Sequence, residues 1–211
     1  MVVLHYYPGN ASLLPHMVLR EIGAPFRLSL VDRGQNAQQS DAYLRLNPNG
    51  KIPVLVDGDL VLYEAAAIAL HLADLHPEAG LAPALGTPER AHFYRWMVHL
   101  TNTPQHEFRA WFYPHEHVTD EACAPSVKAA AEERLNGMFD RIEAQLGTGP
   151  WLLGERFSAA DLFLLMLIRW GRGMARPPRS LPNLGAFAQR ALARPAVQEA
   201  LAAEGLAAPF V

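Results

Sequence analysis

The stretch Lys51-Ile-Pro-Val-Leu55 and the segment Leu62-Tyr-Glu-Ala65 combine residue types that can hold a small extended ligand. Proline has no backbone N–H, and in its cis form it turns the chain sharply, so Pro53 can expose neighbouring backbone to such a ligand. Val54 would supply that backbone. Glu64 stands where a helix should begin, and a carboxylate there can accept helix N–H groups and also bind an ammonium. We therefore expect the Ile52–Pro53 bond to be cis, and we expect Pro53 and Glu64 to face one groove.

Three segments carry a resemblance to a known family: Tyr6-Tyr-Pro-Gly-Asn-Ala-Ser-Leu-Leu-Pro-His16, Asn47-Pro-Asn-Gly-Lys-Ile-Pro53 and Tyr63-Glu-Ala-Ala-Ala-Ile68. They resemble the N-terminal domain of cytosolic glutathione S-transferases, and the first segment is most similar to the bacterial beta-class enzymes. The resemblance extends over the whole chain. It implies that glutathione is the co-substrate and that its thiol is activated for conjugation to an electrophilic small molecule or for peroxide reduction.

Thiol activation requires a hydrogen-bond donor near the sulfur, because a free thiol with a pKa of about 8.5 is mostly protonated at neutral pH. Ser12 lies at the expected start of the first helix, where its hydroxyl and the helix dipole could both stabilise a thiolate. The hydroxyl could instead only cap the helix, and both alternatives stay open. Asn10 and Tyr6 are the other candidate donors in this turn.

Two positions depart from the family pattern. Ala11 stands where the beta-class enzymes have a cysteine, so we do not expect mixed-disulfide chemistry there. Ala65 stands where most of the family has a serine or threonine that holds the γ-glutamyl carboxylate. The backbone N–H groups of Ala65 and Ala66 remain at the helix start and suit an anion. Glutathione binding should therefore survive, weakened by about 1 kcal/mol, the usual value of one hydrogen bond.

The resemblance also places polar side chains against the glycyl carboxylate of glutathione, and Lys51 and Gln39 are residues of this kind. The predicted glutathione-binding residues are Gln39, Lys51, Ile52, Pro53, Val54, Glu64 and Ala65. The acceptor substrate should bind in the second half of the chain. His106 and Tyr113 are the candidates there, because they follow Pro104, which should kink or break a long helix.

Hydrophobic periodicity and turn residues predict the elements of the first half. Strands over residues 2–7 and 26–32 flank a helix over 13–22, and a unit of this kind gives a parallel strand pair. A short helix over 41–46, a hairpin turning at Asp57-Gly-Asp59 and a helix from residue 64 to about 75 complete the order βαβ-ββα. This order is typical of a thioredoxin-like domain.

The second half carries only helical signals. A segment rich in proline and glycine, residues 76–88, reads as a linker. Helices are expected over 89–113, 124–146, 159–172 and 184–203, the last one split near Pro195. Ser158-Ala-Ala-Asp161 matches a capping box variant at the start of an almost wholly apolar helix, which should be the buried centre of this half. The predicted fold class is α/β plus all-α, with a thioredoxin-like domain at 1–79 and a helical bundle at 89–211.

Composition restricts the partners. Among the 211 residues, 50% are hydrophobic and 18% charged, and the formal net charge is -3 without a basic run, so nucleic acid and membrane partners are not expected. No apolar segment approaches the roughly 18 to 20 residues that span a bilayer, and no signal sequence is evident, which makes the cytoplasm the default location. Cys123 is the only cysteine, which excludes dithiol exchange.

A metal site is also not expected, because the spacing of His115-Glu-His117 does not place both imidazoles on one helical face. The family resemblance implies a homodimer. A second functional hypothesis remains open, in which the chain is a glutathione-binding or structural protein that keeps the transferase fold with little catalysis. The missing cysteine and the missing Ser or Thr after Glu64 support that alternative.

Overall fold

The computed structural model describes residues 1–211 as two compact units. The first unit contains Met1–Ala84 together with Leu192–Phe210, and the second contains Leu85–Ala191 and the terminal Val211. The predicted domain boundaries, 1–79 and 89–211, are therefore wrong for the last helix. That helix packs against the first unit, where Arg194 forms a bidentate ion pair with Glu21 at 2.6 and 2.8 Å.

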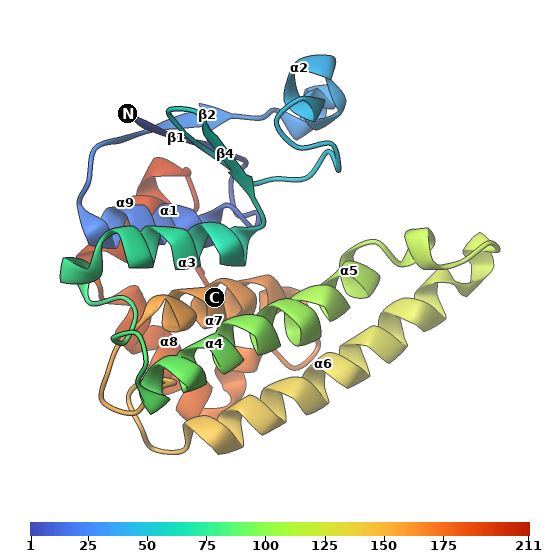
Figure 1. The fold of residues 1–211 in the computed structure, drawn as a ribbon. Coiled ribbons are helices and arrows are strands. Elements are labelled where there is room, and N and C mark those ends of the chain that lie inside the picture. Colours follow the sequence, from blue (N-terminus) through green and yellow to red (C-terminus); the bar gives the residue numbers. More distant parts are fainter. The chain divides into compact units, whose positions relative to one another are not determined.

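The first unit is built on a four-stranded sheet with the order β2-β1-β3-β4 (Figure 1). Its strands are β1 (Val2–Tyr6), β2 (Phe26–Leu30), β3 (Val54–Asp57) and β4 (Leu60–Tyr63). β1 pairs in parallel with β2, whereas β3 is antiparallel to both of its neighbours. This mixed sheet confirms the predicted βαβ-ββα order.

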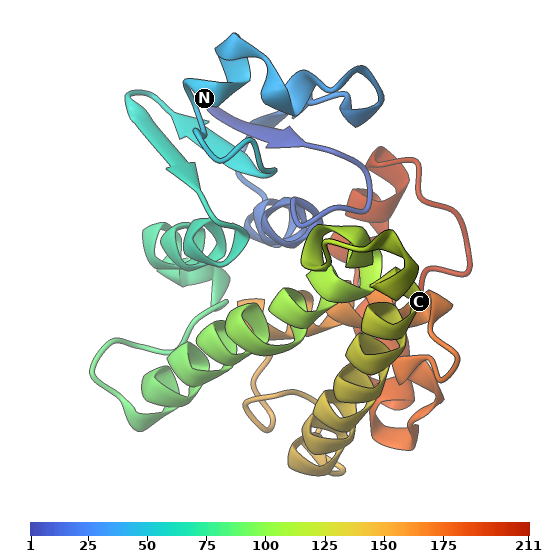
Figure 2. The ribbon, with the colours of Figure 1, turned by 90° about the vertical axis from the view of Figure 1, so that its right-hand side faces the viewer.

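Four α-helices belong to this unit: α1 (Leu13–Ile22), α2 (Asp41–Leu44), α3 (Ala65–Leu75) and α9 (Pro195–Ala203). Three short 3-10 turns, Arg33–Gln35, Ala37–Gln39 and Pro77–Ala79, complete it. α1 ends as predicted at Gly23, which adopts a left-handed conformation with a φ of 74° and donates its N–H to the Leu19 carbonyl. α9 lies along α1 (Figures 1 and 2).

The two faces of the sheet are covered by different helices because successive strand residues point in opposite directions. Val54 packs with Tyr43 of α2, and Val56 lies against the same cluster. Leu55, between them, points to the opposite face, which α1 and α3 cover in Figure 1. The start of β3 is therefore held between packed layers on both of its sides.

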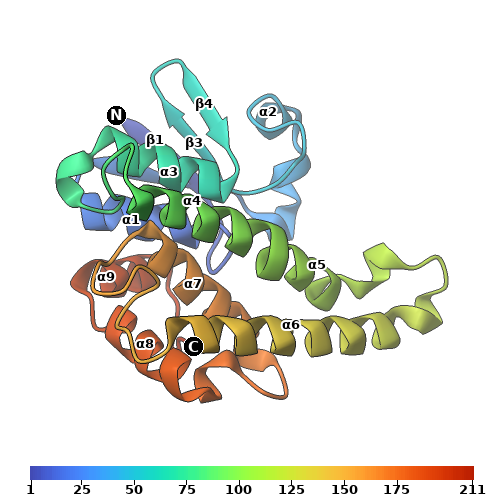
Figure 3. The same cartoon turned by 60° about the horizontal axis from the view of Figure 1, so that its bottom comes forward.

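The second unit is helical, as predicted. Its helices are α4 (Pro88–Leu100), α5 (His106–Phe112), α6 (Ala124–Leu146), α7 (Ala159–Trp170) and α8 (Pro182–Leu192), whose last residue belongs to the first unit. Short 3-10 turns lie at Pro114–His117, Glu121–Cys123, Gly171–Gly173 and Pro178–Ser180. α5 and α6 run side by side (Figure 3). No helix is both long and apolar enough to cross a bilayer.

Pro104 interrupts the predicted helix over 89–113, at the position where the sequence predicts a break. Thr101–Gln105 form a π-helical turn between α4 and α5, and Pro104 lies inside it. Proline removes one helical N–H and displaces the backbone of the preceding turn, which accounts for the irregular segment. Such π-helical turns are frequent at functional sites.

The predicted capping box at the start of α7 is confirmed. Asp161 Oδ2 accepts hydrogen bonds from the Ser158 N–H at 2.8 Å and from Ser158 Oγ at 3.0 Å, and Oδ1 accepts one from the Leu152 N–H at 2.8 Å. Burial raises the pKa of Asp161 to about 6, although these hydrogen bonds act in the opposite direction. α7 is buried from Ala159 through Arg169, so it is the centre of its unit as predicted.

Candidate functional site

The end of the β3–β4 ladder brings the two most informative residues of the sequence together. The Ile52–Pro53 peptide bond is cis, which confirms that prediction. Val54 pairs with Tyr63 in the antiparallel register. Pro53 and Glu64 occupy the next position of that register, so they stand opposite each other where the ladder ends. Ile52 and Pro53 are buried, and Val54 is fully enclosed.

Glu64 has an unusual backbone conformation. Its φ of 75° and ψ of 113° lie in a region that non-glycine residues rarely adopt, at a typical cost of about 1–3 kcal/mol. Its carboxylate is exposed and has no hydrogen bond or ion pair within the chain. The expectation that this carboxylate accepts N–H groups of its own helix is therefore wrong. The strained backbone instead presents a free anion at the start of α3.

The start of α3 also presents free backbone donors. The first hydrogen bond of the helix runs from the Ile68 N–H to the Glu64 carbonyl at 2.9 Å. The N–H groups of Ala65 and Ala66 precede it and have no helical acceptor. Ala65 itself is buried, so it can bind a ligand through its backbone N–H and not through its side chain. The Glu64 carboxylate, which can bind a cation, thus lies next to the N–H groups of Ala65 and Ala66, which can bind an anion.

The turn before Pro53 brings the two predicted glycyl-carboxylate ligands together. Lys51 is exposed and forms no ion pair, and Gln39 is exposed at the end of a 3-10 turn. The Gln39 side chain lies directly on Gly50, because a Cβ atom built at Gly50 would meet Gln39 Nε2 at 2.5 Å. Gly50 also has a φ of 59°, so a side chain is disfavoured there on two grounds.

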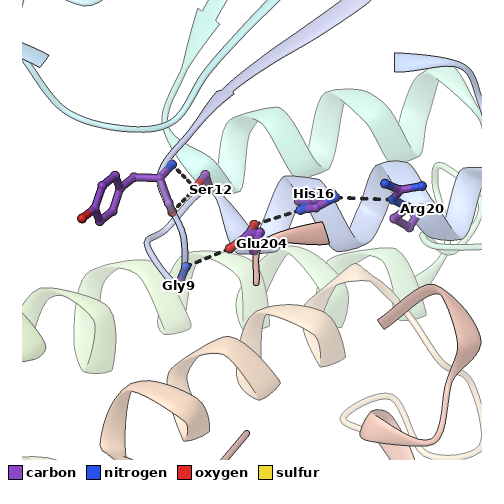
Figure 4. A network of polar contacts seen from close by, with 6 residues as sticks. Gly9, Ser12, His16, Arg20 and Glu204 are labelled. Carbon is purple, nitrogen blue, oxygen red and sulfur yellow. Dashed lines mark hydrogen bonds and ion pairs between the residues drawn. The ribbon is translucent and has the colours of Figure 1, made fainter. Parts of the chain in front are cut away.

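Ser12 does not cap α1, because its hydroxyl is hydrogen-bonded within the preceding loop. Its Oγ donates to the Tyr7 carbonyl at 3.1 Å and accepts from the Tyr7 N–H at 3.2 Å (Figure 4). It makes no capping hydrogen bond to α1, so the capping alternative is wrong. The residue is fully buried and its proton is donated to Tyr7, so it would have to leave Tyr7 to donate to a thiol. Its hydroxyl closes the loop that leads from β1 into α1.

Asn10 and Tyr6 differ in what they can donate. Asn10 Oδ1 accepts the Ala11 N–H at 2.6 Å, while the Asn10 amide nitrogen has no partner within the chain. The Tyr6 ring packs edge-on against His16 with a centroid distance of 6.4 Å. Tyr7 packs instead against the cluster around Tyr43 on the other face of the sheet. The two tyrosines therefore point to opposite faces of the sheet.

A buried polar network fixes the same loop from the far end of the chain (Figure 4). Glu204 Oε2 accepts the Gly9 N–H at 2.8 Å, and Oε1 accepts His16 Nδ1 at 2.8 Å. Arg20 Nε lies 3.4 Å from His16 Nε2 and can only donate, so the ring proton of His16 is on Nδ1. Sequence reasoning missed this network, because Glu204 follows the last turn of α9, where the helix dipole disfavours a carboxylate.

The acceptor-site candidates lie in the second unit at the two ends of α5. His106 is exposed at its first position, and Tyr113 is half-buried just beyond its last. The Tyr113 ring contacts those of Phe112 and His115. Phe112 is 43% exposed, so this end of α5 presents aromatic surface. No group of three or more His, Cys, Asp or Glu residues is arranged to hold a metal ion.

Two family models match the chain. The N-terminal domain of glutathione S-transferases matches residues 12–75, and the C-terminal domain of the same family matches residues 112–195. The chain belongs to the glutathione S-transferase family. It is 33% identical over 205 residues to the glutathione S-transferase GstA of Escherichia coli O157:H7, which covers 96% of this chain and 98% of that protein.

Solved glutathione S-transferase structures share this fold. The enzyme from Xylella fastidiosa matches with a TM-score of 0.90 at 32% identity, covering 98% of this chain and 100% of that one. A bacterial beta-class enzyme from Sphingomonas chungbukensis matches with a TM-score of 0.86 at 34% identity, covering 97% and 100%. A glutathione transferase homologue from Sulfitobacter, solved with bound glutathione, matches with a TM-score of 0.89 at 27% identity, covering 98% and 99%.

This chain departs from the beta-class pattern in its first turn. Ala11 is buried in place of the beta-class cysteine, and the neighbouring Ser12 hydroxyl is bonded to Tyr7. The candidate side-chain donors that stay unpartnered here are the amide of Asn10 and the hydroxyl of Tyr6.

Proposed function

We propose that this protein is a glutathione transferase whose first unit binds glutathione as an extended peptide beside Pro53. The free carboxylate of Glu64, held in a strained backbone opposite Pro53, carries this proposal. Glu64 takes the γ-glutamyl ammonium, and the N–H groups of Ala65 and Ala66 take the adjacent carboxylate. An exposed anion without a partner, beside open backbone donors, is complementary to the zwitterionic end of glutathione.

The rest of the peptide extends along the proline turn. The backbone of Ile52 binds the cysteinyl residue, and Lys51 and Gln39 bind the glycyl carboxylate. Lys51 is exposed with no ion pair, so its ammonium is available to an anionic ligand. This assignment uses the residues that the sequence indicated except Val54, which is fully enclosed and paired with Tyr63.

Asn10 is the thiol-activating donor in this proposal. Its amide nitrogen is unpartnered, and its orientation is fixed because its Oδ1 accepts the Ala11 N–H. A donor to sulfur favours the thiolate and so lowers the thiol pKa. Tyr6 is the next candidate, since its ring is only partly buried. Ser12 is the weakest of the three, because its hydroxyl is already used by Tyr7.

The activated sulfur attacks an electrophilic carbon, and a C–S bond forms as the leaving group departs. With a peroxide, the sulfur attacks one oxygen, the O–O bond breaks to release an alcohol, and a second glutathione converts the resulting sulfenic acid to glutathione disulfide and water. His106 and Tyr113 contact the acceptor in this account, and the reaction serves the detoxification of electrophiles in the cytoplasm. A second copy of the chain completes a homodimer. Exposed apolar side chains on the edge strand β4 support such pairing, since Leu60, Val61 and Tyr63 are between 37% and 41% exposed.

Two observations favour a second candidate, a glutathione-binding protein with little catalysis. The first turn lacks the beta-class cysteine, and the Ser12 hydroxyl is committed to the backbone. This alternative predicts that glutathione binds as an ordinary thiol. It therefore differs from the enzyme hypothesis in turnover and in thiolate content, but not in affinity.

Calorimetry with glutathione, followed by steady-state assays, tests the proposal. The assays use one aryl halide, one epoxide and one organic hydroperoxide, each at saturating glutathione. We expect saturable binding and turnover at least tenfold above the uncatalysed rate with one of these acceptors. Binding without turnover or thiolate formation would select the second candidate, and no binding would contradict both.

A further inference from the structure

The carbonyl of Lys51 receives two side-chain hydrogen bonds that the glutathione assignment does not use. Tyr43 Oη donates to it at 2.9 Å, and Asn47 Nδ2 donates to it at 2.8 Å. A carbonyl oxygen has two lone pairs, so both are occupied. Both donors are buried, with Asn47 only 3% and Tyr43 only 5% exposed. Two buried side chains thus converge on the backbone of one exposed lysine.

The two donors are themselves firmly held. The Tyr43 ring belongs to the apolar cluster with Val31, Ile52 and Val54, and its carbonyl accepts the Asn47 N–H at 3.0 Å. Asn47 Oδ1 accepts the Asn49 N–H at 3.1 Å, and the Asn47 carbonyl accepts the Gly50 N–H at 3.0 Å. The donors therefore form a closed ring of hydrogen bonds that leads from α2 back to Lys51.

The backbone of Lys51 is held in place by this ring of hydrogen bonds, whereas the backbone of Val54 is not. Val54 is the first residue of β3 and is paired with His5 on one side and Tyr63 on the other. Lys51 lies outside the strand, where no ladder fixes its backbone. Removing one of the two donors should therefore release Lys51 while β3 stays in place.

We infer that Tyr43 and Asn47 are positioning residues that hold Lys51 at the glycyl carboxylate of glutathione. This inference rests on the proposed function, because it assigns Lys51 the role given there. The side chain of a lysine has several rotatable bonds, so a fixed backbone is what limits the volume its ammonium explores. The hydrogen bonds from Tyr43 and Asn47 to Lys51 thus increase the affinity for the glycyl end of the ligand alone.

The test compares glutathione with γ-glutamylcysteine, which lacks the glycyl residue. Tyr43→Phe keeps the aromatic ring and removes only the phenolic hydroxyl. We expect it to weaken glutathione binding about fivefold, which corresponds to about one hydrogen bond, and to change γ-glutamylcysteine binding less than twofold. Tyr94→Phe in the second unit, where the tyrosine is 40% exposed, is the matched control and should change neither.

Asn47→Asp keeps the acceptor for the Asn49 N–H and replaces the donor to Lys51 with a carboxylate oxygen. Asn49→Asp adds the same charge to the same turn without touching the Lys51 carbonyl, so Asn47→Asp should lose more glutathione affinity than Asn49→Asp. In a Lys51→Ala background, Tyr43→Phe should have no further effect on glutathione binding. That result would show that the hydroxyl acts through Lys51.

Equal losses for both ligands, or a full effect of Tyr43→Phe without Lys51, would overturn the positioning role and leave the proposed function intact. So would unchanged glutathione affinity in both Tyr43→Phe and Asn47→Asp. If the parent protein bound γ-glutamylcysteine as tightly as glutathione, the glycyl assignment of Lys51 would fail together with this inference. Failure of the parent to bind either ligand would contradict the proposed function itself.

Discussion

Glu204 and Gly9 are joined by a 2.8 Å hydrogen bond across 195 positions of sequence (Figure 4). The other carboxylate oxygen of Glu204 accepts His16 Nδ1, so one buried anion connects the first loop and the first helix. That loop carries Asn10, the proposed donor to the thiol. The residue after α9 is therefore part of the support of the candidate active-site loop, and this explains why 192–210 belongs with the first unit.

Glu204→Gln should lower the free energy of unfolding by about 1–3 kcal/mol. An amide offers one acceptor oxygen, so either Gly9 or His16 meets an NH2 group and stays unsatisfied in a buried position. Denaturant unfolding measures the loss, and amide hydrogen exchange should show reduced protection of the Gly9 N–H. Glu199→Gln is the control on α9, because the Glu199 side chain is 63% exposed and lies 3.7 Å from Arg20. An equal loss in both variants would contradict the role of the network.

The three candidate thiol donors can be separated by the thiolate absorbance of bound glutathione. Asn10→Ala should raise the pKa of the bound thiol and reduce turnover near neutral pH, with much of the loss recovered at higher pH. Tyr6→Phe should leave that titration in place. Ser12→Ala should mainly lower stability, by about 1–2 kcal/mol for two lost hydrogen bonds to Tyr7.

A shift of the thiolate titration in Ser12→Ala alone would contradict the assignment of Asn10. It would mean that the serine hydroxyl leaves Tyr7 when glutathione binds. A shift in Tyr6→Phe alone would move the assignment to Tyr6. If the parent showed no thiolate at neutral pH, the binding-protein alternative would replace the enzyme hypothesis.

Asp161 should make stability depend on pH in a direction unusual for a carboxylate. Burial raises its pKa from 3.8 to about 6, so the folded state binds more protons on this group than the unfolded state between these values. Its stabilising contribution is complete below pH 4 and is lost as the pH rises through about 6. Urea unfolding between pH 4 and 7, followed by tryptophan fluorescence, measures this slope.

Asp161→Asn should remove the contribution of Asp161 to the pH dependence of the free energy of unfolding. It should also lower that free energy, because an amide cannot accept from both Leu152 and Ser158. Ser158→Ala removes hydroxyl bonding but keeps the titrating group, so it should lower stability and keep the slope. The account of Asp161 is contradicted if Asp161→Asn and the parent protein have the same pH dependence over this range.

Much of the fold followed from local signals in the sequence. Gly23 ends α1, Pro104 breaks the helix before His106, and Ser158 with Asp161 starts α7, each where its residue type predicts. Pro53 is cis, and Glu64 lies at the start of α3. These features depend on conformational preferences of single residues or on hydrogen bonds within a few positions, which sequence patterns capture.

The remaining features depend on contacts between distant residues. Glu204 is unfavourable at the end of α9 by local rules, and its partners Gly9 and His16 are known only once the chain has folded. Ser12 is a good capping residue by type, but the Tyr7 backbone competes for its hydroxyl. In both cases a tertiary or loop hydrogen bond prevails over the local preference.

Calorimetry on Glu64→Gln with two ligands tests the central claim most directly. The ligands are glutathione and its deamino analogue, glutaryl-cysteinylglycine, which lacks the ammonium. If Glu64 holds the ammonium, Glu64→Gln should weaken glutathione binding by about 1.5–3 kcal/mol, the range for a charged hydrogen bond, and leave the analogue nearly unchanged. Glu89→Gln in the first turn of α4 is the matched control. Equal affinities of Glu64→Gln and the parent protein for glutathione would contradict the account.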